Sequence, residues 1–179
     1  MNEYSLIYAD PPWSWKAWSE KGEDRSAKNH YKVMPIEDIC SFPVIDLAAK
    51  DSVLALWAIS PMLPDALRVM ESWGFRYKTV LFVWVKGRIG LGYYTRAGAE
   101  LCLLGTRGGL LSRIDRGVPQ VIHAKPREHS RKPDEAAERL ERLFGDIPRI
   151  ELFARAKRPG WEVWGDELTC FNLAQLFNI

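Results

Sequence analysis

The sequence Leu6-Ile7-Tyr8-Ala9-Asp10-Pro11-Pro12-Trp13 decides the fold class. Its apolar first half predicts a short buried strand over residues 5–9. A carboxylate, two rigid prolines and a large aromatic follow at once, where that strand should end. Because open α/β sheets bind ligands outside the carboxyl ends of their strands, we expect Asp10 to lie in a functional site at the edge of a sheet.

The Asp10-Pro11-Pro12-Trp13 motif suits a flat base that carries an exocyclic amine. Asp10 and the backbone carbonyl of Pro11 can each accept one N–H of the amine, which localises its lone pair for attack on a methyl donor. The proline ring locks φ and so fixes the direction of that carbonyl. Trp13 offers a stacking face worth roughly 1–3 kcal/mol per base. The same residues also form an ordinary turn, and the motif alone leaves both interpretations open.

Size and composition indicate one ordinary globular domain over residues 1–179, with 47% hydrophobic residues. The net charge of only +2 means that any nucleic-acid role must rest on local patches. The three widely spaced cysteines predict reduced core thiols in a cytoplasmic protein. No histidine has metal-ligand spacing, and we expect no metal site, no secretory leader and no membrane span.

Apolar runs and helical periodicity alternate along the chain. Strands are expected at residues 5–9, 52–59, 75–85, 100–105, 121–124, 149–154 and 161–164. Helices are expected at residues 34–40, within 129–144, and at 63–73, where Leu63, Leu67 and Met70 form one apolar stripe. This alternation predicts an α/β fold with a mainly parallel sheet flanked by helices.

Two loops look functional. Residues 13–34 are long, polar and rich in tryptophan, which predicts a mobile lid over the site. Residues 87–98, directly after Lys86, mix basic, glycine and aromatic residues, the composition of a nucleic-acid contact loop. Within it Arg88 and Arg96 are predicted to contact phosphates, and Tyr93 to stack on bases. The loop lacks the third glycine of a dinucleotide-binding fingerprint.

The C-terminal third holds candidates for binding a polar cofactor. Lys132 stands just before a helix N-terminus, where it suits a carboxylate guest, although a solvated basic turn would look the same. Glu151 and Arg155 end a strand and could hold ribose hydroxyls or form a simple salt bridge. Arg158 suits a phosphate contact or a solvated turn.

These motifs together resemble the MT-A70 family of S-adenosylmethionine-dependent adenine N6-methyltransferases. The matching blocks are Asp10-Pro11-Pro12-Trp13, Trp84-Val85-Lys86, His129-Ser130-Arg131-Lys132-Pro133-Asp134-Glu135, Glu151-Leu152-Phe153-Ala154-Arg155 and Trp161-Glu162-Val163-Trp164-Gly165-Asp166-Glu167. Their order is that of permuted, β-class amino-methyltransferases, and they cover nearly the whole chain. The resemblance implies a Rossmann-like class I methyltransferase fold, and the compact size is similar to that of bacterial and phage members.

The resemblance also implies roles for residues on the substrate side. Asp10 and the Pro11 carbonyl would hold the target amine, while Pro12 and Trp13 would sandwich the base. Tyr31 falls where the family has an aromatic residue that closes on substrate. Further substrate contacts are expected from Trp15, Lys86, Arg88, Tyr93 and Arg96.

On the cofactor side, Lys132 and neighbouring Ser130 would bind the methionine end of S-adenosylmethionine. Glu151 and Arg155 would bind its ribose. Asp166 and Glu167 stand where eukaryotic members carry an Asn-Gln pair around the adenine, which is a departure from the family pattern.

The resemblance implies methyl transfer to N6 of adenine in DNA, by analogy to compact microbial members. RNA is the alternative substrate. A different class is an inactive methyltransferase-fold subunit that binds nucleic acid or a catalytic partner. The chain shows no separate recognition domain, so we expect modest sequence specificity or a homodimer in which one subunit positions DNA for the other.

Overall fold

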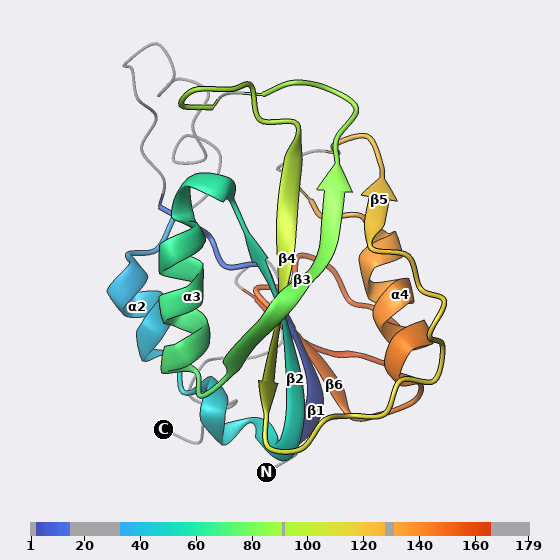
Figure 1. The fold of residues 1–179 in the computed structure, drawn as a ribbon. Helices are drawn as coiled ribbons and strands as arrows, with labels where there is room; N and C mark the ends of the chain where they lie inside the picture. The colour runs from blue at the N-terminus through green and yellow to red at the C-terminus, as the bar shows by residue number, and fades with distance from the viewer. Residues whose placement is uncertain (1–2, 15–32, 91, 128–130, 166–179) are drawn as a thin grey trace.

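A single twisted sheet organises the computed structural model, which describes residues 3–14, 33–90, 92–127 and 131–165 (Figure 1). Its strands are β1 (Tyr4–Ala9), β2 (Ala48–Ala58), β3 (Arg76–Val85), β4 (Ala99–Arg107), β5 (Val121–His123), β6 (Arg149–Leu152) and β7 (Glu162–Trp164). In the described part of the chain their order across the sheet is β5-β3-β4-β2-β1-β6-β7. The seven expected strands are therefore all present.

Strand direction brings the functional segments to one edge. β4 runs antiparallel to β2 and β3, and every other pairing among the described strands is parallel. The expected mainly parallel α/β sheet is confirmed, and its arrangement agrees with the Rossmann-like fold that the resemblance implies. All described strands except β4 end at the same edge, so Asp10 after β1, Lys86 after β3 and Phe153 after β6 emerge there together.

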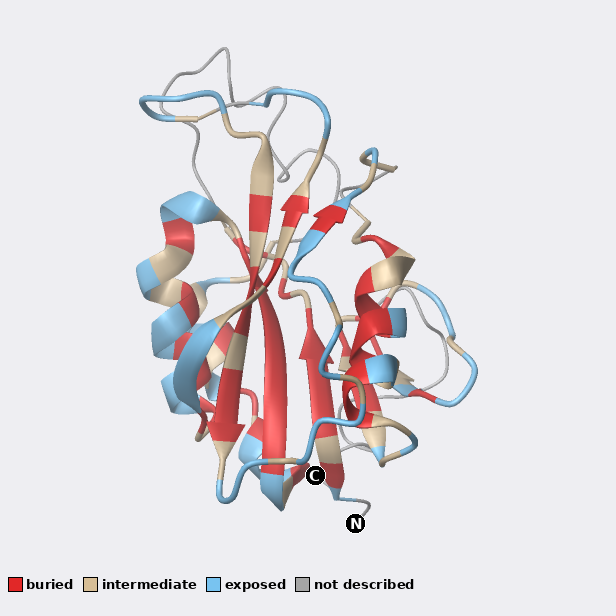
Figure 2. Ribbon diagram, turned by 45° about the vertical axis from the view of Figure 1, so that its right-hand side comes forward, coloured by how far each residue is buried: buried red, intermediate tan, exposed pale blue. Residues whose placement is uncertain are grey.

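Helices cover both faces of the sheet. α2 (Ile36–Ser41) and α3 (Leu63–Ser72) pack on one face and α4 (Asp134–Phe144) on the other (Figures 1 and 2). Side chains of β1 alternate between two apolar clusters, with Ile7 facing α3 and Tyr8 facing α4. Because both faces are covered, the central strands are nearly continuous apolar runs, which is why the sequence revealed them so clearly.

The buried face of α3 differs from the expected stripe. Ala66, Val69 and Met70 are buried, whereas Leu67 is 37% exposed. The cause lies just past the helix at Trp73, which is fully buried and donates from its indole Nε1 to the carbonyl of Ile39 at 2.9 Å. This large anchor lies three and four residues after Met70 and Val69, so it fixes the helix face on their side and turns Leu67 outward.

We expect Met70→Ala to lower the free energy of unfolding by roughly 2–5 kcal/mol, because it leaves a cavity between α3 and the sheet. Leu67→Ala, in the same helix, should cost less than about 1 kcal/mol, because the side chain is exposed. Urea unfolding followed by tryptophan fluorescence measures both. Equal losses would show that the helix docks with the face expected from sequence.

Candidate active site

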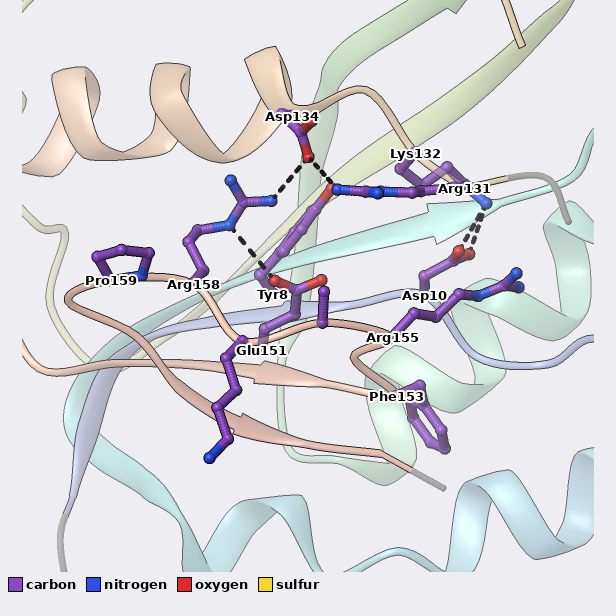
Figure 3. A pocket seen from close by; sticks show the side chains of 12 residues that line it. Tyr8, Asp10, Arg131, Lys132, Asp134, Glu151, Phe153, Arg155, Arg158 and Pro159 are labelled. Carbon is purple, nitrogen blue, oxygen red and sulfur yellow. Dashed lines mark hydrogen bonds and ion pairs between the residues drawn. The ribbon is translucent and has the colours of Figure 1, made fainter. Parts of the chain in front are cut away.

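A cavity of about 210 Å³ opens at the carboxyl edge of the sheet (Figure 3). Its walls come from the ends of β1 and β6, the turn after β6 and the segment that leads into α4. Asp10, Lys132, Glu151 and Arg155, four residues singled out in the sequence, all line it. Motifs separated by more than a hundred residues in the chain thus form one site.

Asp10 and Lys132 form the centre of the site. The Lys132 Nζ lies 2.7 Å from each oxygen of the Asp10 carboxylate, and both side chains are mostly buried. Burial raises the pKa of Asp10 by desolvating its charge, and the ammonium of Lys132 opposes that rise. Lys132 therefore contacts the acceptor carboxylate directly, in addition to lining the cavity where a cofactor carboxylate was expected.

Glu100, near the start of β4, completes a chain of alternating charges and was missed in the sequence. Its Oε2 lies 3.3 Å from Lys132 Nζ, close enough for an ion pair although not aligned as a hydrogen bond, and its Oε1 accepts a hydrogen bond from Lys86. Burial alone would raise the pKa of Glu100, but the two ammonium groups outweigh it and hold that pKa below its usual value. An acid within the apolar run of β4 was the available signal.

Lys86 differs from its expected role. It was expected to contact nucleic acid from a basic loop, but its ammonium pairs with Glu100 and lies 4.8 Å from the centre of the Trp84 ring. Its side chain is only 21% exposed. The reason is its position directly after β3, beside the start of β4, where a buried carboxylate needs a counter-charge.

The Pro-Pro-Trp part of the motif is anchored to the core. The amide of Trp13 donates to the carbonyl of Pro11 at 2.9 Å, and the indole of Trp13 donates to the carbonyl of Trp57 at 3.0 Å. The Trp13 ring is 5% exposed and belongs to the apolar cluster beneath α3. A base-stacking role for Trp13 is not supported in this structure, because its aromatic face is already covered.

Asp134, the first residue of α4, ties the cavity wall together. Its carboxylate contacts Arg127 at 2.6 Å, Arg131 at 3.2 Å and Arg158 at 3.3 Å. The hydrogen bond from Arg127 is the largest of the influences that lower its pKa to about 2. Arg127 also donates to the backbone carbonyl of Lys132 at 2.7 Å, which links this cluster to the residue that holds Asp10.

Glu151 lies at the other end of the cavity from Lys132 (Figure 3). Burial raises its pKa, and Arg158, whose Nε lies 3.6 Å from the carboxylate, opposes the rise. Arg158 is thus a bridge between Glu151 and Asp134, which replaces the solvated turn or phosphate contact considered for it. Phe153, also in the cavity wall, has a left-handed backbone with φ of 61°, a strained conformation typical of functional sites.

The remaining predicted residues divide into two groups. Arg88, Tyr93 and Arg96 lie exposed in the hairpin between β3 and β4. The second group lies outside the described residues and consists of Trp15, Tyr31, Ser130, Asp166 and Glu167. Most of the expected lid at residues 13–34 also lies outside them. No cluster of three or more potential metal ligands occurs in the described part of the chain, and no described helix could cross a membrane.

Comparison with known proteins places this site in a family. The MT-A70 family model matches residues 4–167, which include every segment that lines the cavity. The chain belongs to the MT-A70 family. It is therefore an S-adenosylmethionine-dependent adenine N6-methyltransferase, as the resemblance of its motifs implied.

Individual MT-A70 relatives differ in how much of their length this chain covers. The Type II methyltransferase M.MunI of a Mycoplasma is 32% identical over 93% of this chain and 78% of its own length. A probable N(6)-adenosine-methyltransferase of rice is 30% identical, and the human N(6)-adenosine-methyltransferase catalytic subunit METTL3 is 27% identical. Each matches 97% of this chain, which spans only 24% and 30% of those two proteins.

Opposite changes on the two sides of Lys132 should move the pKa of Asp10 in opposite directions. Lys132→Met removes the neighbouring positive charge and raises that pKa further, whereas Glu100→Gln removes a negative charge and lowers it. The ¹³C shift of the Asp10 carboxyl, titrated with pH, measures both, and the exposed Lys125→Met is the control. Movement in the same direction in both variants would contradict the charge chain.

Proposed function

We propose that this protein transfers the methyl group of S-adenosylmethionine to N6 of adenine in DNA, with Asp10 as the group that holds the amine. The observation that carries the proposal is the pairing of buried Asp10 with Lys132 at one end of a cavity that has Glu151 at its other end. The Asp10 carboxylate suits the amine of the base, and the Glu151 carboxylate suits the ribose of the cofactor.

The residues of the cavity fit S-adenosylmethionine, which supplies an electrophilic methyl group on a sulfonium. The Lys132 ammonium suits the carboxylate of the methionine end, and the mostly buried Glu151 carboxylate suits the ribose hydroxyls. The buried Nε of Arg158 has no hydrogen-bond partner within the described protein, so the polar wall beside Glu151 is not fully satisfied internally. Arg155 lines the same cavity, and Ser130, Asp166 and Glu167 are proposed to complete the set from outside the described residues.

Asp10 acts as an acceptor and an electrostatic partner. Its ionised carboxylate accepts one N–H of the adenine amine, and the Pro11 carbonyl, which has a second lone pair beyond the one used by Trp13, accepts the other. Positive charge that develops on N6 as it bonds to carbon is stabilised by the carboxylate. Lys132 opposes the rise in the pKa of Asp10 that burial causes, and so favours the ionised form of this carboxylate.

DNA is favoured over RNA by how the relatives align. The chain covers most of a Type II methyltransferase, whereas it covers less than a third of the N(6)-adenosine-methyltransferases. The inactive-partner alternative is disfavoured because Asp10, Lys132 and Glu151 are all present and meet in one cavity. We also propose that the protein is cytoplasmic and forms a homodimer in which one subunit positions DNA for the other. Sedimentation of the protein with and without DNA tests the dimer.

Labelled S-adenosylmethionine should transfer its methyl group to DNA, with N6-methyladenine as the product. Matched single-stranded DNA, duplex DNA and RNA of the same sequence, analysed as nucleosides, separate the substrates. Transfer to RNA alone would overturn the choice of DNA. Cofactor binding without transfer to any of the three would overturn the proposed acceptor.

Separate substitutions of Asp10 and Glu151 should distinguish the effect on catalysis from the effect on cofactor binding. Asp10→Ala should lower kcat by at least about 10²-fold because transition-state stabilisation is lost, while cofactor affinity changes little. Glu151→Gln should weaken cofactor binding roughly 10-fold, because a charged hydrogen-bond acceptor is lost. Single-turnover kinetics and calorimetric cofactor titration measure the two effects, with exposed Asp38→Ala as the control. Full turnover by Asp10→Ala would overturn the mechanism.

A further inference from the structure

The hairpin between β3 and β4 forms a narrow projection above the carboxyl ends of the strands, here called the finger and defined as residues 86–90 and 92–98 (Figures 1 and 2). Its two arms are joined by backbone hydrogen bonds from Lys86 to Gly98 at 2.9 Å and from Gly90 to Ala97 at 2.6 Å. A Cβ at Gly92 would lie 2.0 Å from the carbonyl oxygen of Thr95, so the turn at the tip requires glycine. The tip therefore has a defined turn conformation.

This turn presents aromatic side chains to solvent. Tyr94 is fully exposed and Tyr93 is 52% exposed at the tip, while Ile89 on one arm is 75% exposed. Single exposed apolar residues are common, but three on one short hairpin form a surface suited to burial against a partner.

The charges on the finger indicate the chemistry of that partner. Arg88 and Arg96 lie exposed, one on each arm, and the sequence from Lys86 to Ala99 contains no acidic residue. An aromatic tip between cationic arms complements bases flanked by phosphates.

The base of the finger is connected to the reacting centre by consecutive contacts. Lys86 pairs with Glu100, Glu100 faces Lys132, and Lys132 holds Asp10. These contacts fix the base of the finger relative to Asp10.

We propose that Tyr94 is a wedge that enters duplex DNA beside the target adenine and fills the space left when that base turns out toward Asp10. This inference rests on the proposed function, and it adds the form of the substrate and the residue that opens it. Removal of a base from the stack is costly, and inserted side chains that replace its stacking are a known way to offset that cost. Arg88 and Arg96 hold the phosphates on either side of the opening.

A duplex in which the target adenine faces an abasic site tests the wedge, because that adenine is already loosened. Tyr94→Ala should lower kcat/KM roughly 10- to 100-fold on the normal duplex, the range set by loss of one stacking contact, and far less on the abasic duplex or on single strands. Tyr94→Phe should retain activity because it keeps the ring. Fluorescence of 2-aminopurine at the target position, with a cofactor analogue bound, should rise with the wild type and not with Tyr94→Ala.

Two controls separate stacking from other roles. Arg96→Ala should weaken activity on both duplexes alike and reduce the salt dependence, because a phosphate contact does not depend on base pairing. Tyr77→Ala, an exposed tyrosine near the start of β3 at the far end of the sheet, should change nothing.

Equal loss on both duplexes, or no loss, with Tyr94→Ala would overturn the wedge and leave the methyl transfer itself standing. A wild-type protein that methylates only single-stranded DNA would do the same. A wild type that methylates only RNA would overturn both the wedge and the choice of DNA. A dimer that dissociates in Tyr94→Ala, with duplex activity lost in proportion, would show that the tip binds a second copy instead.

Discussion

The alternating charges Asp10, Lys132, Glu100 and Lys86 are the constraint on which the rest of the site depends. Each of these groups is mostly buried, and a buried charge is tolerated only with an opposite charge in contact. The chain therefore fixes the end of β1, the end of β3, the start of β4 and the segment before α4 relative to one another. Buried ion pairs add little net stability, but the loss of one member leaves its partner as an uncompensated buried charge. The geometry of the acceptor carboxylate follows from the pairing.

The apolar scaffold beneath that chain explains why the motif divides as it does. Trp13 turns inward and bonds the carbonyl of Trp57, whose own indole donates to the hydroxyl of Tyr8 at 2.7 Å. These bonds satisfy polar groups that burial would otherwise leave without partners. They connect the motif that contains Asp10 to β2 and connect β2 to β1. Asp10, in contrast, turns toward the cavity. Of the eight tryptophans in the sequence, Trp57, Trp73 and Trp84 are fully buried and belong to the core.

The sequence predicted the sheet because its strands are buried on both faces and appear as apolar runs. It missed the first residues of β2, where exposed Lys50 and Asp51 interrupt the pattern although the strand already begins at Ala48, which pairs with Tyr4. The members of the cavity were predictable where motifs carry unusual residues at strand ends. The partners of Lys86 and Lys132 were not, because an ion pair between β4 and the segment before α4 leaves no trace in spacing. The position of Glu100 in the apolar run of β4 was unusual, but only the folded sheet shows which charges surround it.

The acidic groups of the site differ in how their charge responds to pH, and this difference separates scaffold from chemistry. Asp134, with a pKa of about 2, stabilises the fold above the pKa of an unfolded aspartate, and that contribution is lost as pH falls toward 2. Asp10 and Glu151 have raised pKa values, so their preference for the protonated form favours folding at low pH, and this contribution is lost as pH rises through those values. Above those raised pKa values, the ionised forms of both carboxylates cost the folded protein stability. Two arginines hold the ends of the cavity in place against this cost. Arg127 joins Asp134 to the backbone carbonyl of Lys132, and Arg158 joins Asp134 to Glu151.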